Sequence, residues 1–397
     1  MQYNFDQIID RQHTNAMSVE GYEDYLFGEE TALAITHEKK DLIRMWVADM
    51  EFAVAPEIID AIKKRLEHPI FGYSGIFEKT YSTSFQKWCK KRYDWSFDEA
   101  HLVYAQGVIP ALFSLVEYLC QKEDKILFFT PSYAFFKHAA NYNGVGLLTS
   151  DLVYENGEYF IDFEDFRNKA KRSDVSLFIL CNPHNPIGKV WSDEELKKLG
   201  EICLENEVSI IADEIHCDLL RKNKQFTPLA KLFPDNDQII TCMAPSKTFN
   251  LAGFMFANII IPDEKIRIHW QERNLPVVNP LSVVAAEAAY AKGATWLAAL
   301  TDYLDDNFIF LDNFLKMHLP KAKFHIPDAT YLAWVDLSAY FPKGENLTLF
   351  FANQAGVILE GGNMFVSNAD GFIRLNLACP KAKLEEGLIR IAEVLRD

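Results

Sequence analysis

The chain has 397 residues and a formal net charge of −16, and hydrophobic residues make up 49% of it. A chain of this length is too long to fold around one hydrophobic core of ordinary size, so we expect two domains, or a large domain with a smaller one. The acidic charge and the lack of any clustered run of Lys and Arg argue against a nucleic-acid partner. The hydrophobic content argues against disorder.

The amino terminus, "MQYNFDQIIDRQ", has no basic segment followed by an apolar one, and no apolar stretch approaches the length of a membrane span. A soluble, cytoplasmic protein is therefore expected. The 7 cysteines contain no CxxC pair and mostly lie in apolar contexts, which favours reduced core thiols. The 10 histidines contain no HExxH motif, so no metal site is expected.

Between about residue 100 and residue 260, short apolar runs alternate with amphipathic segments. This alternation is typical of βαβ units around a mostly parallel sheet with helices on both faces. The segment 192–206, "SDEELKKLGEICLEN", opens with a capping box formed by Ser192 and Glu195 and is expected to be a crossover helix. The predicted strands are 101–106, 125–130, 176–181, 208–213, 238–244 and 256–261.

The carboxy-terminal part has a different pattern. Long helices are predicted over 295–320, followed by a strand at 331–337, a helix at 347–356 and a strand at 372–378. We therefore predict a large α/β domain at 46–285 and a smaller α+β domain built from 1–45 and 286–397.

Polar residues directly follow the predicted strands, where ligands bind in open α/β sheets. Taken singly, each of these residues has an ordinary explanation. Gly107 could belong to a turn, Asp213 could cap a helix, and Lys247 could be a surface lysine. Together, a lysine, a buried carboxylate, an aromatic ring and a helix amino terminus suit pyridoxal phosphate, which needs an amine, a partner for its ring nitrogen and an anion site. The residues at these strand ends are Tyr133, Asn185, Asp213, His216, Ser246 and Lys247.

Four motifs in this order, "NPHNPIG", "ADEIHCDL", "APSKTFNLAG" and "RLNLACP", resemble the fold-type I aminotransferase superfamily. Within it, the form "DEIH", with His216 where tyrosine is common, resembles the MalY/PatB branch of cystathionine beta-lyases, or C-S beta-lyases. "MWVADMEFAVAP" and "FGYSG" extend the resemblance over nearly the whole chain. The resemblance implies a fold-type I pyridoxal-phosphate-dependent transferase-like fold with a large and a small domain.

The resemblance also implies roles for individual residues around pyridoxal 5'-phosphate. Lys247 would form a Schiff base with the cofactor aldehyde, and Asp213 would pair with the ring nitrogen. Asn185 and His216 would lie near the ring oxygen O3′, and Tyr133 would stack on the ring.

Further residues are implied for the phosphate and for the substrate. Gly107, Val108, Ile109 and Ser246 would cradle the phosphate. Tyr73 would reach the phosphate of a neighbouring subunit, which implies a homodimer with a shared active site. Arg374 would bind the substrate α-carboxylate, a task that suits its planar guanidinium, with Ala48 and Asn185 beside it.

The expected reaction is β-elimination from cystathionine or a related cysteine thioether, giving a thiol, pyruvate and ammonia. An aminotransferase acting on an amino acid and a 2-oxo acid would use the same residues, so it stays open as an alternative. A non-catalytic regulatory protein on this fold is a further alternative, which the lysine, aspartate and arginine set makes less favourable.

Overall fold

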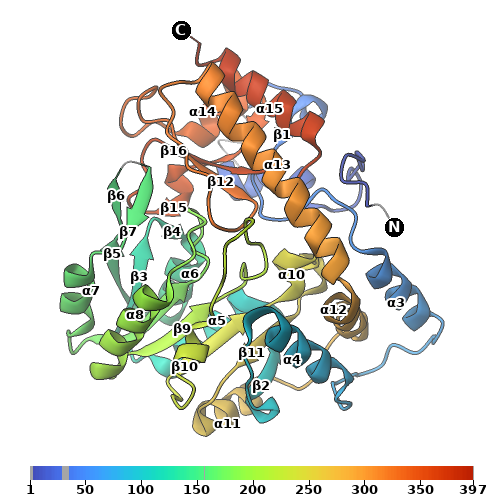
Figure 1. Cartoon of the computed structure of the whole chain (residues 1–397), viewed down its shortest axis with the longest axis vertical. Helices are drawn as coiled ribbons and strands as arrows, with labels where there is room; N and C mark the ends of the chain where they lie inside the picture. Colours follow the sequence, from blue (N-terminus) through green and yellow to red (C-terminus); the bar gives the residue numbers. More distant parts are fainter. Residues whose placement is uncertain (1–2, 29–34, 156, 397) are drawn as a thin grey trace.

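The computed structural model describes residues 3–28, 35–155 and 157–396. Figure 1 shows a broad sheet with its helices in the lower half and a smaller group of strands and helices above it. The long helix α13 (Ala294–His318) runs from one half to the other. The fold is the predicted α/β architecture.

The large sheet has seven strands in the order β2-β11-β10-β9-β8-β3-β5. The antiparallel strand β11 lies between β2 and β10, and the other neighbouring pairs are parallel. The carboxyl ends of β2, β10, β9, β8 and β3 therefore share one edge. The bounds are β2 Leu102–Ala105, β3 Lys125–Thr130, β5 Gly146–Asp151, β8 Val175–Cys181, β9 Ser209–Asp213, β10 Ile239–Met243 and β11 Ala257–Ile260.

The strands of this sheet are apolar on both faces because helices cover both. In β3, Ile126 and Phe128 join one buried cluster, and Leu127 and Phe129 join another. The first cluster includes residues of α5 (Val108–Leu119), α6 (Ala134–Asn143) and α11 (Glu264–Arg273); the second includes residues of α7 (Phe163–Ala170) and α8 (Asp193–Glu205). The six predicted strands are confirmed.

Helix α8 begins where the sequence predicts. The Ser192 hydroxyl accepts a hydrogen bond from the Glu195 amide, and the Glu195 carboxylate accepts one from the Ser192 amide. Leu196, Leu199 and Ile202 are buried against the sheet. This helix is the crossover between β8 and β9.

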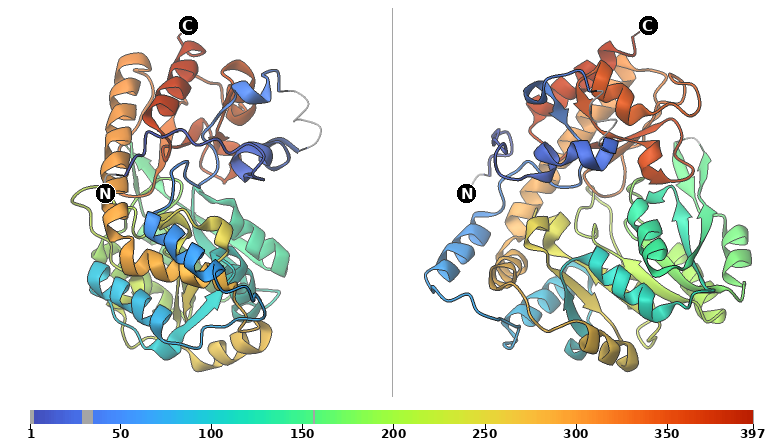
Figure 2. Two further views of the ribbon diagram at one scale, coloured as in Figure 1. Left: turned by 90° about the vertical axis from the view of Figure 1, so that its right-hand side faces the viewer. Right: turned by 180° about the vertical axis from the view of Figure 1, so that it is seen from behind.

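The upper half contains the three-stranded antiparallel sheet β12-β16-β14, formed by β12 (Leu332–Asp336), β16 (Phe372–Asn376) and β14 (Glu360–Gly361). Helices α14 (Leu347–Gln354) and α15 (Lys381–Glu393) lie with it. Strand β1 (Ile43–Arg44) pairs in parallel with β13 (Val357–Ile358), and Figure 2 shows the amino-terminal segment against this half. These contacts support our proposal that residues 1–45 join the small domain.

Helix α12 (Pro280–Lys292) packs against α3 (Pro56–Leu66) and α4 (Thr80–Tyr93) in the lower half. It spans the boundary that we propose at residue 285.

Over the described ranges, no helix is long and apolar enough to cross a membrane. The shorter elements include α1 Met17–Glu20, β4 Ser132–Tyr133, β6 Val153–Glu155, β7 Glu158–Phe160, α9 Leu229–Leu232, α10 Pro245–Thr248 and β15 Phe365–Val366.

Candidate active site

Lys247 lies in the one-turn helix α10, directly after β10, with Pro245 in its first turn. Its Nζ donates a hydrogen bond of 2.7 Å to the carbonyl oxygen of Ala48. Burial and the positive charge of Arg374 together lower the pKa of Lys247 to about 8, against the opposing charges of nearby carboxylates such as Asp213. The amine is therefore close to losing its proton at neutral pH, as a nucleophile or base requires.

Asp213 is the last residue of β9, the strand that pairs with β10, and its side chain is buried. Burial raises the pKa of its carboxyl to about 6, against the opposing effects of the Ile215 amide and the charge of Lys247. A carboxylate held in a dry site without a matched cation is a candidate partner for a ligand.

Arg374 joins the two halves of the molecule. It lies in β16 with 2% of its surface exposed, and its Nη1 donates to Asn185 Oδ1 at 3.0 Å. Its Nη2 donates to the Trp46 carbonyl at 3.1 Å and also forms an ion pair with Glu360. Asn185 follows β8, so this contact brings the small sheet to the edge where Asp213 and Lys247 lie.

His216 is buried beside these groups. Burial lowers its pKa well below the ordinary value, and the positive charges of Lys247 and Arg374 act in the same direction. The ring is therefore neutral. Among the residues that the structure describes, its Nδ1 atom has no hydrogen-bond partner, which leaves a polar atom available to a ligand.

Tyr133 lies in β4 and pairs with Phe365 of β15. Burial raises the pKa of its hydroxyl, and the carboxylates of Glu360 and Asp213 act in the same direction while Arg374 opposes them. The ring is therefore near the same charged groups, and it stacks on Phe135 with centroids 5.0 Å apart. Its predicted stacking on a cofactor stays a prediction.

The predicted phosphate cradle lies at the same edge of the sheet. Gly107 has a φ of 139°, which favours glycine, and it precedes the first turn of α5, where Val108 and Ile109 lie. The amino terminus of this 12-residue helix follows β2, and the first N–H groups of a helix have no acceptor within the helix, so they suit an anion. Ser246 lies next to Lys247 in α10. Phosphate binding by these residues stays a prediction.

Two predicted site residues have a different setting. Tyr73 is 99% exposed, so within its own chain it lies in no buried site. Ala48 takes part through its main chain: its carbonyl accepts hydrogen bonds from Lys247 and, at 2.8 Å, from the Tyr331 hydroxyl.

The sequence reasoning missed Glu360, Trp46 and Tyr331. Glu360 had a readable signal, because a carboxylate inside the apolar run "VILEGG" needs a buried cation. Trp46 contributes a main-chain carbonyl, which no sequence pattern reveals. Tyr331 opens a predicted strand, where an aromatic residue fits an ordinary core position.

The residues fit pyridoxal phosphate. The partly buried Lys247, with its lowered pKa, is present for the aldehyde, and the buried Asp213 carboxylate is present for the ring nitrogen. The Nδ1 atom of His216, which has no partner among the described residues, lies near them. A metal ion has no comparable set of ligands, since no group of three or more His, Cys, Asp and Glu suitable for a metal occurs in the described part of the chain.

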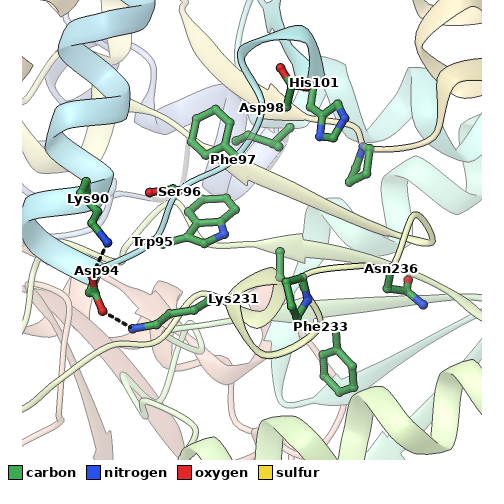
Figure 3. A pocket seen from close by; sticks show the side chains of 14 residues that line it. Lys90, Asp94, Trp95, Ser96, Phe97, Asp98, His101, Lys231, Phe233 and Asn236 are labelled. Carbon is green, nitrogen blue, oxygen red and sulfur yellow. Dashed lines mark hydrogen bonds and ion pairs between the residues drawn. The ribbon is translucent and has the colours of Figure 1, made fainter.

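A separate cavity of about 530 Å³ is shown in Figure 3. Trp95, Phe97, His101, Lys231 and Phe233 are among its lining residues. His101 directly precedes β2, so this cavity lies at the sheet edge opposite to the one with the titratable groups. The predicted site residues do not line it.

Comparison with known proteins agrees with this geometry. The family model "Aminotransferase class I and II" matches residues 40–391. The chain is 41% identical to cystathionine beta-lyase PatB of Bacillus subtilis, over 89% of this chain and 93% of the relative.

Two solved structures are also similar to the whole chain. The pyridoxal-phosphate-bound C-S lyase from Staphylococcus hominis has a TM-score of 0.95 and 48% identity, with 100% of this chain and 99% of that one covered. A putative aminotransferase from Clostridium difficile has a TM-score of 0.93 and 40% identity, with 99% and 100% covered. The chain therefore belongs to the class I and II aminotransferase family, in its MalY/PatB branch.

Proposed function

We propose that this protein is a pyridoxal-phosphate-dependent carbon-sulfur lyase that acts on cystathionine or related cysteine thioethers. The observation that carries the proposal is the partly buried Lys247 amine, with its pKa lowered to about 8, near the buried carboxylate of Asp213. The PatB and Staphylococcus hominis relatives, which carry lyase names, support the choice of reaction.

The bound cofactor would supply an aldehyde for an amine and a ring that withdraws electrons from the substrate. Lys247 would hold it covalently, and Asp213 would keep its ring nitrogen protonated. Asn185 and His216 would face its ring oxygen, and Tyr133 would stack on the ring. Gly107, Val108, Ile109 and Ser246 would bind its phosphate.

The protein's own groups position the substrate and move its proton. Arg374, which Asn185 Oδ1 and the Trp46 carbonyl hold in place, would bind the substrate α-carboxylate. The Lys247 amine, with a pKa of about 8, is suited to accept the proton from Cα near neutral pH. The Ala48 carbonyl orients that amine through a 2.7 Å hydrogen bond.

The overall reaction breaks the bond between Cβ and sulfur and consumes one water molecule. Cystathionine and water give homocysteine, pyruvate and ammonia, so atoms and charge balance without an external oxidant or 2-oxo acid. An aminotransferase would instead need a 2-oxo acid to accept the amino group. It remains the second candidate because the similar Clostridium difficile protein is named a putative aminotransferase.

We also propose that the active enzyme is a homodimer. Tyr73, Phe77 and Leu275 are 99%, 90% and 83% exposed, and the segments that carry them are joined by a hydrogen bond of 2.9 Å from the Val278 amide to the Ser74 carbonyl. A second copy covering these apolar side chains would bring Tyr73 to the phosphate site of that copy. All seven cysteines are free of disulfides and six of them are buried, which is consistent with a cytoplasmic location.

The test is the absorption spectrum of the purified protein, followed by pyruvate release from cystathionine without any 2-oxo acid. A yellow protein that releases pyruvate and homocysteine in equal amounts is the expected result. Release of product only after a 2-oxo acid is added would favour the aminotransferase. A protein that takes up no pyridoxal phosphate would overturn both.

A further inference from the structure

Arg374, the residue proposed to bind the substrate carboxylate, already faces a carboxylate of its own chain. Glu360 of β14 is the register partner of Arg374 in β16, and its carboxylate forms an ion pair with Nη2. Both residues are buried, with 5% and 2% of their surfaces exposed. The sequence reasoning and the proposed reaction assign no role to Glu360.

The hydrogen bonds of Arg374 show what this ion pair occupies. A guanidinium can hold a carboxylate with two parallel N–H groups either at its Nε and Nη2 side or at its Nη1 and Nη2 end. Both arrangements use Nη2. In this structure Nη2 contacts Glu360 and the Trp46 carbonyl, and Nη1 contacts Asn185. Within the described residues, Nε has no partner. Because Nη2 carries two N–H groups, a two-pronged substrate carboxylate has to displace either Glu360 or the Trp46 carbonyl from it, and Glu360 is the only side chain of the two.

Arg374 has contacts other than Glu360 that orient it. The Asn185 Oδ1 and Trp46 carbonyl contacts hold the guanidinium from two sides, and the Phe365 ring lies 5.2 Å from its central carbon. With Glu360 ionised, an incoming carboxylate would place two negative charges on one buried cation, and like charges in a dry site repel strongly.

We propose that Glu360 is a specificity-determining residue: its carboxylate occupies Arg374 until a substrate carboxylate displaces it, and so it sets how tightly an amino acid with a free α-carboxylate binds. This inference rests on the proposed role of Arg374. It concerns the substrate end of the site and is independent of which bond is broken afterwards.

The test compares two ligands that differ only in the carboxylate, L-alanine and L-alaninamide, by equilibrium titration of the holoenzyme. Glu360→Gln keeps the shape and an oxygen acceptor for Arg374 but removes the charge. We expect L-alanine to bind at least about tenfold more tightly to this variant, while L-alaninamide binding changes less than about threefold. Glu360→Ala should act in the same direction, so an insoluble Gln variant leaves the test intact.

The control is Glu99→Gln, which removes a glutamate that pairs with Lys79 before β2, at the opposite sheet edge. It should leave both dissociation constants unchanged. Weaker L-alanine binding to Glu360→Gln, or an equal change for both ligands, would overturn the inference and mark Glu360 as a structural support. Arg374→Ala separates the two proposals: if it keeps the wild-type preference between the ligands, the role of Arg374 itself is wrong.

Discussion

Asp213 should make the cofactor-free protein less stable than it would be with a neutral residue at this position. The carboxyl is buried, and its pKa rises from 3.8 to about 6 because burial disfavours the charge. We therefore expect Asp213→Asn, which keeps the shape and an oxygen acceptor for the Ile215 amide, to raise the free energy of unfolding at neutral pH.

The magnitude follows from the two pKa values. They differ by about 2, and each pKa unit corresponds to about 1.4 kcal/mol, so ionisation costs about 3 kcal/mol of folding stability at pH 7.5. Since the folded pKa is the higher one, this cost is absent below pH 3.8 and grows until the pH has passed about 6. At pH 5 it should be about half as large, near 1.5 kcal/mol.

The assay is urea unfolding of wild type and Asp213→Asn without cofactor, at pH 7.5 and pH 5. The matched control is Asp218→Asn, because Asp218 is also buried but accepts hydrogen bonds from Trp88 and Tyr93 and pairs with Arg92. Removing that charge should destabilise the protein by about 3 to 5 kcal/mol.

A loss of stability in Asp213→Asn, or a gain of the same size at both pH values, would refute this reasoning. A loss would mean that the surroundings of Asp213 compensate its charge in the absence of the cofactor, and an equal gain would mean that ionisation of Asp213 is not the cause of the gain. The expected gain would instead mean that the site holds a costly charge for a ligand to stabilise.

Three further predictions concern single residues. Lys247→Ala and Lys247→Arg should both abolish pyruvate release, since neither offers an amine of lowered pKa; any turnover above background in a pyruvate assay would contradict this. Ser192→Ala should lower the free energy of unfolding, measured with urea, by about 1 kcal/mol, because the Glu195 amide loses its hydrogen-bond acceptor. Leu180 is buried in β8, and Leu180→Ala should lower the free energy of unfolding by about 2 to 5 kcal/mol. An unchanged urea midpoint in Ser192→Ala or Leu180→Ala would show that the replaced residue does not stabilise its helix or strand.

The central strands could be predicted because their burial on both faces leaves a continuous apolar run. β5 was not predicted. It is the edge strand beside β3, most of its residues are only partly buried, and it includes Thr149, Ser150 and Asp151. With only one neighbouring strand, it needs no apolar run, so its sequence resembles a loop.

The candidate site was predictable where single side chains follow predicted strands, as for Asp213, Asn185 and Lys247. The ion pair between Glu360 and Arg374 could not be predicted, because it depends on the register between β14 and β16 rather than on local sequence. The contribution of Trp46 was also hidden, since any residue at that position would offer the same main-chain carbonyl.

The Ala48 carbonyl receives the hydrogen bonds of both Lys247 and Tyr331, and a carbonyl belongs to every amino acid. No side-chain replacement at position 48 deletes this acceptor. In a saturation mutagenesis library, small residues at position 48 would therefore change the activity little, although the carbonyl oxygen at this position accepts a hydrogen bond from the reactive amine. Functional maps built from substitutions alone would overlook this contact, and replacing the amide bond with an ester or moving the segment would be needed to reveal it.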